Sequence, residues 1–234
     1  SVGGALQREL RESGVATAST ILEAGNRKYI PVYRTGAWTG DVQAFALDAF
    51  GQVGAQLWNA ETKVPAHGSR NIYTWSTDAS PAPAAVPFTW AAMGSANQTA
   101  LGTVGATHTT ALVNYLRGDR SNEGDGFPFR AREGVLGDMI NSNPVLLKGL
   151  LNMRYDTLPA SQGSATYGAY LTAKRARPAT LFVGGNDGML HAFRDTEGAV
   201  PSQDGQEVFA FVPKGVYPNL SKLSDKIYGT TVIG

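Results

Sequence analysis

Three histidines are the residues of this sequence best suited to acid–base chemistry or metal binding: His67, His108 and His191. They lie far apart, and neither an H-E-x-x-H motif nor a G-x-S-x-G motif accompanies them. His191 lies in a strand-like run whose alternation puts Leu190 and Ala192 on the opposite face, so we expect it to be packed or hydrogen-bonded rather than a ligand. With no cysteine in the chain, thiol catalysis and Cys-ligated metals are excluded. The sequence therefore predicts no catalytic, cofactor-binding or metal-binding residue.

Arg117, Gly118 and Asp119 spell the integrin-recognition tripeptide and are the candidate adhesion residues of the chain. In an exposed loop, their opposite charges could contact a receptor and its metal ion. A structural role is the stronger alternative, because Gly118 could cap a preceding helix while Arg117 faces the carbonyls at the helix end. Both interpretations stay open.

The same loop gathers oxygen ligands of the kind that calcium prefers: Asp119, Asn122, Glu123 and Asp125. Their spacing does not fit the D-x-[DN]-x-[DN]-G pattern of a calcium loop, and residues 195–205 fit no better. We therefore expect a solvated acidic loop at this position.

Composition bounds the kind of protein that positions these residues. The sequence has 234 residues, of which 42% are hydrophobic and 17% charged, and this balance predicts a globular chain with a substantial core. A net charge of +1 without a basic stripe argues against nucleic-acid binding, and no apolar run is long enough to span a membrane. The 28 glycines and 12 prolines, scattered between short apolar runs, favour an all-β fold with many turns.

The periodicity of the chain predicts strands separated by loops and a few short helices. Strands are expected at 28–35, 40–48, 55–60, 70–77, 143–152 and 206–213. Short helices are expected at 5–14, 106–116, 166–177 and 216–223, with loops at 78–87 and 117–128.

A hairpin at residues 181–198 is repeated in outline earlier in the chain. Asn186-Asp187-Gly188 is expected to supply the positive φ angles of its turn. The run Gly188 to Phe193 aligns with Gly40 to Phe45, and each is followed by a glycine turn and a strand that carries an aromatic residue, Phe209 or Trp58. This frame is typical of one blade of a β-propeller and resembles the quinoprotein-type repeat.

The string YLRGDRSNEGDGFPFRAREGVLGDMINSNPVLL (115–147), followed by ARPATLFVGGNDGMLHAF (176–193), resembles the PilC/PilY family of type IV pilus biogenesis and tip-associated adhesin proteins. The similarity is to the C-terminal β-propeller of that family. Upstream and downstream segments, such as WTGDVQAFALD and EVFAFVPKGVYPNL, lie where the family has similar ones, so the resemblance covers the chain from about residue 29 onward.

The resemblance implies an all-β fold: a β-propeller of quinoprotein-like blades with short inserted helices. Residues 1–25 are expected to form a helical or extended lead-in, and residues 26–234 the N-terminal part of a propeller that another segment completes. It also implies that calcium, if the full-length protein binds it, is held outside these residues.

The same family implies a non-enzymatic structural and interaction module that supports pilus assembly, twitching motility, and adhesion to surfaces or host cells. Its partners would be minor pilins or other pilus components, a host-cell receptor and the remaining propeller segment. Its place would be outside the cytoplasm, at the pilus tip, cell surface or outer membrane of a Gram-negative bacterium. The alternative is a periplasmic quinoprotein-like (PQQ-type) dehydrogenase domain, which would hold a chromophoric cofactor in the propeller axis.

Overall fold

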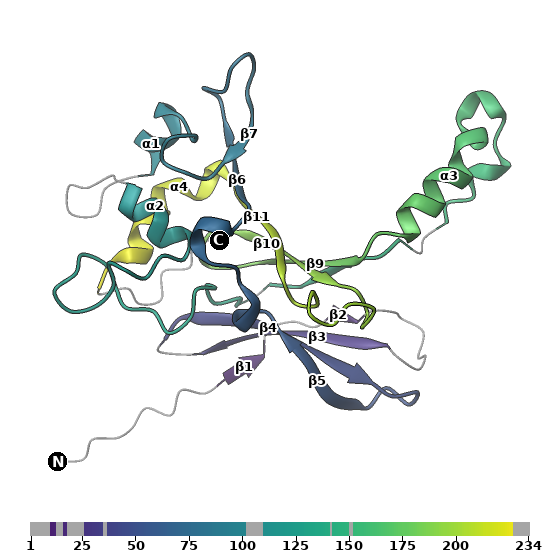
Figure 1. Ribbon diagram of the computed structural model, residues 1–234, viewed down its shortest axis with the longest axis horizontal. Helices are drawn as coiled ribbons and strands as arrows, with labels where there is room; N and C mark the ends of the chain where they lie inside the picture. The colour runs from purple at the N-terminus through teal and green to yellow at the C-terminus, as the bar shows by residue number, and fades with distance from the viewer. Residues whose placement is uncertain are drawn as a thin grey trace.

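The protein is built from two β-sheets, with short helices packed mainly on one of them (Figure 1). The computed structural model describes residues 10–12, 16–17, 26–34, 37–101, 110–140, 142–149 and 152–226. The first sheet has five strands: β1 (Leu10–Glu12), β2 (Ala16–Thr17), β3 (Arg27–Arg34), β4 (Thr39–Leu47) and β5 (Val53–Asn59). Its order is β1-β3-β4-β5, with β2 also paired to β3, and every pairing is antiparallel.

The second sheet has six strands in the order β7-β6-β11-β10-β9-β8. They are β6 (Ile72–Ser76), β7 (Ala84–Pro87), β8 (Val145–Leu147), β9 (Ala179–Gly184), β10 (Leu190–Asp195) and β11 (Glu207–Val212). All pairs are antiparallel except β6 with β11, which is parallel and joins the β6–β7 hairpin to the last strand.

The helices are short. The α-helices are α1 (Ser95–Ala100), α2 (Thr110–Arg117), α3 (Ser164–Arg175) and α4 (Tyr217–Leu220). The 3-10 turns are η1 (Glu61–Lys63), η2 (His67–Ser69), η3 (Tyr155–Thr157), η4 (Ala160–Gln162), η5 (Lys214–Val216) and η6 (Ser221–Ser224). Within the described ranges, no helix is long and apolar enough to cross a bilayer.

One face of the second sheet is covered by two different layers. Leu181, Val183 and Phe193 on β9 and β10 pack against Tyr29 and Val42 of the first sheet. Further along the same face, the buried side chains of β6 and β11 pack against α2 and α4 in a second core cluster. The burial of apolar side chains in both layers supplies the main stabilising free energy of the fold.

The internal repeat is confirmed at the level of strand register. Ala44 on β4 faces Trp58 on β5, and Ala192 on β10 faces Phe209 on β11. In both strands the register shifts directly after this alanine. A shared bulge at the aligned Ala-Phe pair shows that the two hairpins are built on one plan, as expected of blades in a propeller.

The turn of the 181–198 hairpin differs from its expectation in one respect. Only Gly188 has a positive φ angle, of 79°, whereas Asn186 and Asp187 do not. The Gly188 N–H donates to the Gly185 carbonyl (3.0 Å) and the Gly185 N–H to the Met189 carbonyl (2.9 Å). This is a three-residue loop in which the glycine alone takes the left-handed position, so the polar residues before it keep ordinary backbone angles.

The other predicted elements agree with the structure except at the sheet edges. The helix expected at residues 5–14 is wrong for Leu10–Glu12, which pairs with β3, and the rest of that segment lies outside the described residues. The loop expected at 78–87 ends in a strand, β7, which pairs with β6. In both cases a neighbouring strand offers backbone partners that outweigh weak local propensity.

Two predicted boundaries also shift. The strand expected at 143–152 is confined to Val145–Leu147. Helix α2 runs from Thr110 to Arg117, and residues 106–109 of the helix expected at 106–116 lie outside the described residues.

Candidate functional site

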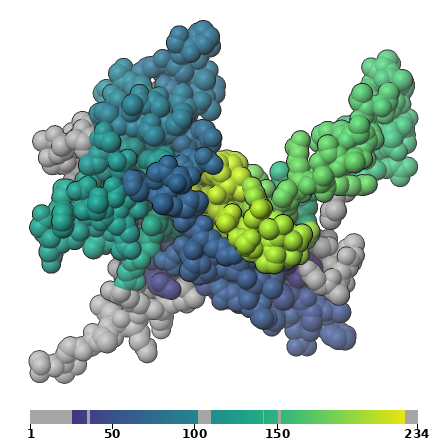
Figure 2. All heavy atoms as spheres, in the orientation of Figure 1, coloured from purple at the N-terminus to yellow at the C-terminus, as the bar shows by residue number. Residues whose placement is uncertain are grey.

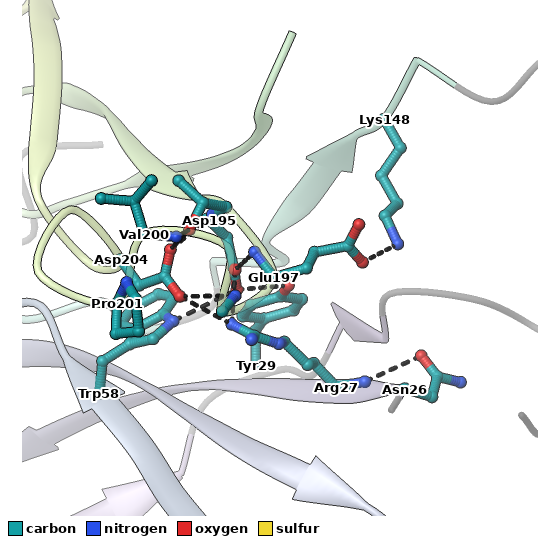
Figure 3. Close-up of polar contacts among 12 residues, drawn as sticks. Asn26, Arg27, Tyr29, Trp58, Lys148, Asp195, Glu197, Val200, Pro201 and Asp204 are labelled. Atoms are coloured by element: carbon teal, nitrogen blue, oxygen red, sulfur yellow. Dashed lines mark hydrogen bonds and ion pairs between the residues drawn. The ribbon is translucent and has the colours of Figure 1, made fainter. Parts of the chain in front are cut away.

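A buried ionic cluster around Asp195 joins the two sheets (Figure 3). The Asp195 carboxylate, which is fully buried at the end of β10, accepts hydrogen bonds from three side chains of the first sheet. These bonds come from Arg27 Nη1 (2.5 Å), Tyr29 Oη (2.8 Å) and Trp58 Nε1 (3.2 Å). One carboxylate of the second sheet thus accepts hydrogen bonds from β3 and β5 of the first, so Asp195 holds the two sheets together.

A second carboxylate completes this cluster. Asp204 Oδ2 lies 3.3 Å from Arg27 Nη1, and Asp204 Oδ1 accepts bonds from the backbone N–H and hydroxyl of Thr196, both at 2.5 Å. Burial lowers the pKa of Arg27, but its hydrogen bonds and charge interactions with Asp195 and Asp204 more than offset this, so its pKa is raised overall. The guanidinium is therefore held charged between two carboxylates.

His191 is the centre of a second buried cluster. Its Nδ1 lies 2.8 Å from Glu207 Oε1, and its Nε2 lies 3.0 Å from Asp187 Oδ2. Arg70 makes a bidentate contact with Glu207, at 2.6 Å from Nε to Oε2 and 2.7 Å from Nη2 to Oε1. The expectation that His191 is a packed, hydrogen-bonded residue is confirmed, since its side chain is 0% exposed.

Burial and charge act against each other on the ionisable groups of this cluster. Burial lowers the pKa of His191, but the Asp187 charge and the hydrogen bonds to both carboxylates raise it to about 9. Burial raises the pKa of Glu207, and the hydrogen bonds from Arg70 and His191 lower it to about 2. At neutral pH the cluster therefore holds two cations and two anions, which compensate one another.

Arg117 of the tripeptide belongs to the interior. Its guanidinium donates to the carbonyls of His67 (2.7 Å), Arg70 (2.9 Å) and Phe88 (3.2 Å), and only 6% of the residue is exposed. A structural Arg117 was expected to face the carbonyls at the end of α2. The three carbonyls that it binds come instead from other segments of the chain. Gly118 follows α2 with a φ angle of 112°, and its N–H donates to the Tyr115 carbonyl, so its role as a helix cap is confirmed.

The rest of the tripeptide loop is fixed by ion pairing. Arg132 contacts Glu123 at 2.6 Å, with both side chains less than 10% exposed, and its guanidinium lies 3.8 Å from the centre of the Tyr115 ring. The expectation of a solvated acidic loop is therefore wrong for Glu123, although Asp125 is exposed. Across the described ranges, no group of three or more His, Asp or Glu side chains is placed to hold a metal ion.

A short segment, residues 136–139, is hydrogen-bonded to both repeated hairpins, at the start of β4 and at the turn before β10. The Gly40 N–H donates to the Leu136 carbonyl (3.1 Å), and the Asn186 N–H donates to the Asp138 carbonyl (2.7 Å). Gly137 is required at the crossing, because a Cβ atom there would lie 2.4 Å from the backbone nitrogen of Asp187. The adjoining cavity has a volume of about 20 Å³, enough for about one water molecule.

The ion pairs that hold these clusters could not be predicted from local sequence patterns. Arg27 and Asp195 stand at strand ends, where charged residues are common, and Arg70 precedes a strand. Glu207 and His191 gave a partial signal. Each is a polar residue in an apolar strand, at a position where the alternation of the strand predicts a buried side chain. The packing of two sheets, which local patterns do not encode, decides their partners.

Comparisons with known proteins agree with a β-propeller fold. Residues 136–233 match a family model described as the PilY1 beta-propeller domain. The chain is 35% and 33% identical to two type IV pilus biogenesis factor PilY1 homologs of Xylella fastidiosa strain Temecula1, over 93% and 96% of its length and 16% and 17% of theirs. It is 33% identical to the type IV pilus biogenesis factor PilY1 of Pseudomonas aeruginosa strain PAK, over 82% of this chain and 16% of that one.

The chain thus spans about a sixth of the length of these curated relatives. No solved structure matches it.

Proposed function

Because this chain belongs to the PilY1 family and forms a segment of its β-propeller, we propose that it works as a rigid binding and scaffolding module, without catalytic turnover. Type IV pilus biogenesis is the process to which its relatives are assigned by name. We place the module outside the cytoplasm, at the pilus tip or cell surface, where it contacts minor pilins or other pilus components. Twitching motility and adhesion are the activities that it would support.

One observation carries the proposal: within the described residues, His191 and the arginines and acids that surround it and Asp195 are buried or nearly so, and they are already paired with one another. His191 and Arg70 both contact Glu207 of the second sheet, and Arg27 and Asp195 form an ion pair across the two sheets. A general acid or base must reach the proton that it transfers. Groups sealed in this way instead fix the relative position of elements, which is the property that a scaffold requires.

The test is genetic and is made in the full-length protein of the source bacterium. Replacing residues 26–226 by a flexible linker should abolish surface pili and twitching, provided that the shortened protein is stable and exported. Asp195→Ala, which removes the tie between the sheets, should give the same defect, whereas Glu197→Ala at the neighbouring surface should not. Normal pili and twitching in the linker strain would overturn the assembly role.

The adhesion tripeptide makes a separate prediction, because its charged residues differ in structural role. Arg117→Met should lower the free energy of unfolding by roughly 2–4 kcal/mol, since three carbonyls lose a charged donor. Asp119→Ala should leave stability nearly unchanged, because the hydrogen bonds described for its carboxylate are local ones to Ser121 in the same loop. If Asp119 contacts a receptor, Asp119→Ala alone reduces host-cell adhesion while piliation stays normal. Unchanged adhesion by that variant rejects the tripeptide as a receptor site.

A further inference from the structure

The connection between β8 and β9 is an insertion in the repeat. β2 pairs with β3 as β8 pairs with β9, so the two connections occupy equivalent places in the two sheets. The first runs over residues 18–26 and the second over residues 148–178, which we call the arm. Insertions on a repeated scaffold commonly supply binding surfaces.

The arm projects away from both sheets (Figures 1 and 2). Contacts among its own aromatic residues stabilise it. The Tyr167 ring lies 5.3 Å from Tyr155 and 6.0 Å from Tyr170, centre to centre, and its hydroxyl accepts the Met153 N–H at 2.7 Å. Helix α3 therefore packs on the η3 turn of the arm itself. Only Tyr167 and Leu171 of α3 are buried, and most of its other side chains are exposed among the described residues.

The arm is basic, although the chain as a whole is nearly neutral. Its cations are Lys148, Arg154, Lys174, Arg175 and Arg177, and its one acid is Asp156. A charge of +4 on the arm against +1 for the chain leaves −3 on the remainder. No described residue forms an ion pair with Arg175 or Arg177, and both are exposed. Such a concentration of charge attracts an anionic partner.

A cleft at the base of the arm offers a place for that partner. It has a volume of about 420 Å³ and is lined by Tyr170, Lys174, Arg177 and Leu147, among others. Its wall includes the end of β8, the outermost strand of the second sheet. Leu147 is 59% exposed, so the cleft combines cations, an aromatic ring and an apolar side chain.

We propose that the arm and the cleft at its base dock an acidic segment of a partner protein. A protein is favoured over a lipid surface or a nucleic acid because the exposed side chains here include tyrosine, methionine and arginine, the types enriched in protein interfaces. Met153, Tyr155 and Tyr170 are each about half exposed, at 53%, 48% and 52%. Among the described strands β8 pairs with β9 alone, so its other edge can pair with an extended peptide backbone. This inference names the chemistry of the partner and goes beyond the proposed role in pilus biogenesis.

The experiment measures binding of the whole chain to fluorescein-labelled poly-L-glutamate by fluorescence anisotropy at low and physiological salt. The test variant is Arg154→Gln/Arg175→Gln/Arg177→Gln. The control is Lys214→Gln/Lys222→Gln/Lys226→Gln, which removes the same charge from exposed positions outside the arm. We expect the arm variant to bind about tenfold more weakly and the control to bind nearly as well as the parent chain, because three surface ion pairs together contribute on this scale.

Two results would overturn the proposal. An equal loss in both variants would mean that the polymer binds by net charge and not at the arm. Tighter binding of the parent chain to anionic lipid vesicles or to heparin than to poly-L-glutamate would assign the arm to a different class of partner. Melting temperatures of both variants should match that of the parent chain, since all six side chains are exposed. A loss of pilus assembly tests the proposed function instead, and neither experiment depends on the other.

Discussion

Asp195→Ala is expected to lower the free energy of unfolding by about 3–5 kcal/mol, the cost typical of removing one partner from a buried ion pair. The substitution leaves Arg27, Tyr29 and Trp58 without their shared acceptor in the interface between the sheets. Arg27 would keep Asp204 as a partner at 3.3 Å, but Tyr29 and Trp58 would lose the acceptor of their side-chain hydrogen bonds. For a chain of this size the melting temperature should fall by roughly 10 °C.

Urea denaturation and thermal melting measure this effect, and Glu197→Ala is the matched control. Glu197 lies two residues away, and its side chain is 45% exposed, so water screens its ion pair with Lys148 and the pair contributes less than a buried one. A double-mutant cycle with Arg27→Met separates the pair from its surroundings. A loss below about 1 kcal/mol for Asp195→Ala would contradict the view that this cluster ties the sheets together.

The strands of this fold were predictable from sequence because their signal is local. Ile72, Thr74 and Ser76 alternate with Tyr73 and Trp75, and the structure buries the first set. The aligned Ala-Phe pairs predicted two equivalent hairpins, and the shared bulge confirms them. Edge strands such as β1 and β7 were missed because their formation depends on a neighbouring strand and not on their own pattern.

The buried charges could not be predicted in the same way. Arg27 and Asp195 are 168 residues apart, and their contact exists only because β3 packs against the end of β10. Arg117 shows the converse error, since a familiar tripeptide suggests an exposed loop while the fold uses its arginine to bind three carbonyls. A short motif reports residue types, whereas exposure is decided by tertiary packing.

The stability of the chain is expected to fall as pH rises from about 6.5 to about 9, because of His191. The pKa of His191 is about 9 in the folded protein and near 6.5 in an unfolded chain, so the folded state binds the proton more tightly. The stabilisation from this proton is therefore complete below pH 6.5 and is lost as pH passes through 9. A shift of this size corresponds to roughly 3 kcal/mol.

His191→Gln is the test variant, since glutamine keeps a donor and an acceptor but does not titrate. At pH 6 the variant should be less stable than the parent chain by roughly 3 kcal/mol, and the difference should shrink towards pH 9.5. His67→Gln is the control, because it makes the same replacement at a histidine that is not one of the residues contacting Asp187 or Glu207. Parallel pH profiles for the parent chain and His191→Gln would show that His191 is neutral in the fold.

The acid side of the profile follows from Glu207, whose pKa is lowered to about 2 in the folded protein. Its contribution is present above the unfolded value near 4.5 and is lost as pH falls towards 2. Glu207→Gln leaves Arg70 buried without its bidentate partner, so it should destabilise the chain at pH 7 by about 3–5 kcal/mol. The two variants together distinguish a charged cluster from a neutral one. In a charged cluster, the stability deficit of His191→Gln shrinks as pH rises towards 9, and that of Glu207→Gln shrinks as pH falls towards 2. Both trends are expected because the cations His191 and Arg70 are compensated only while Asp187 and Glu207 are ionised.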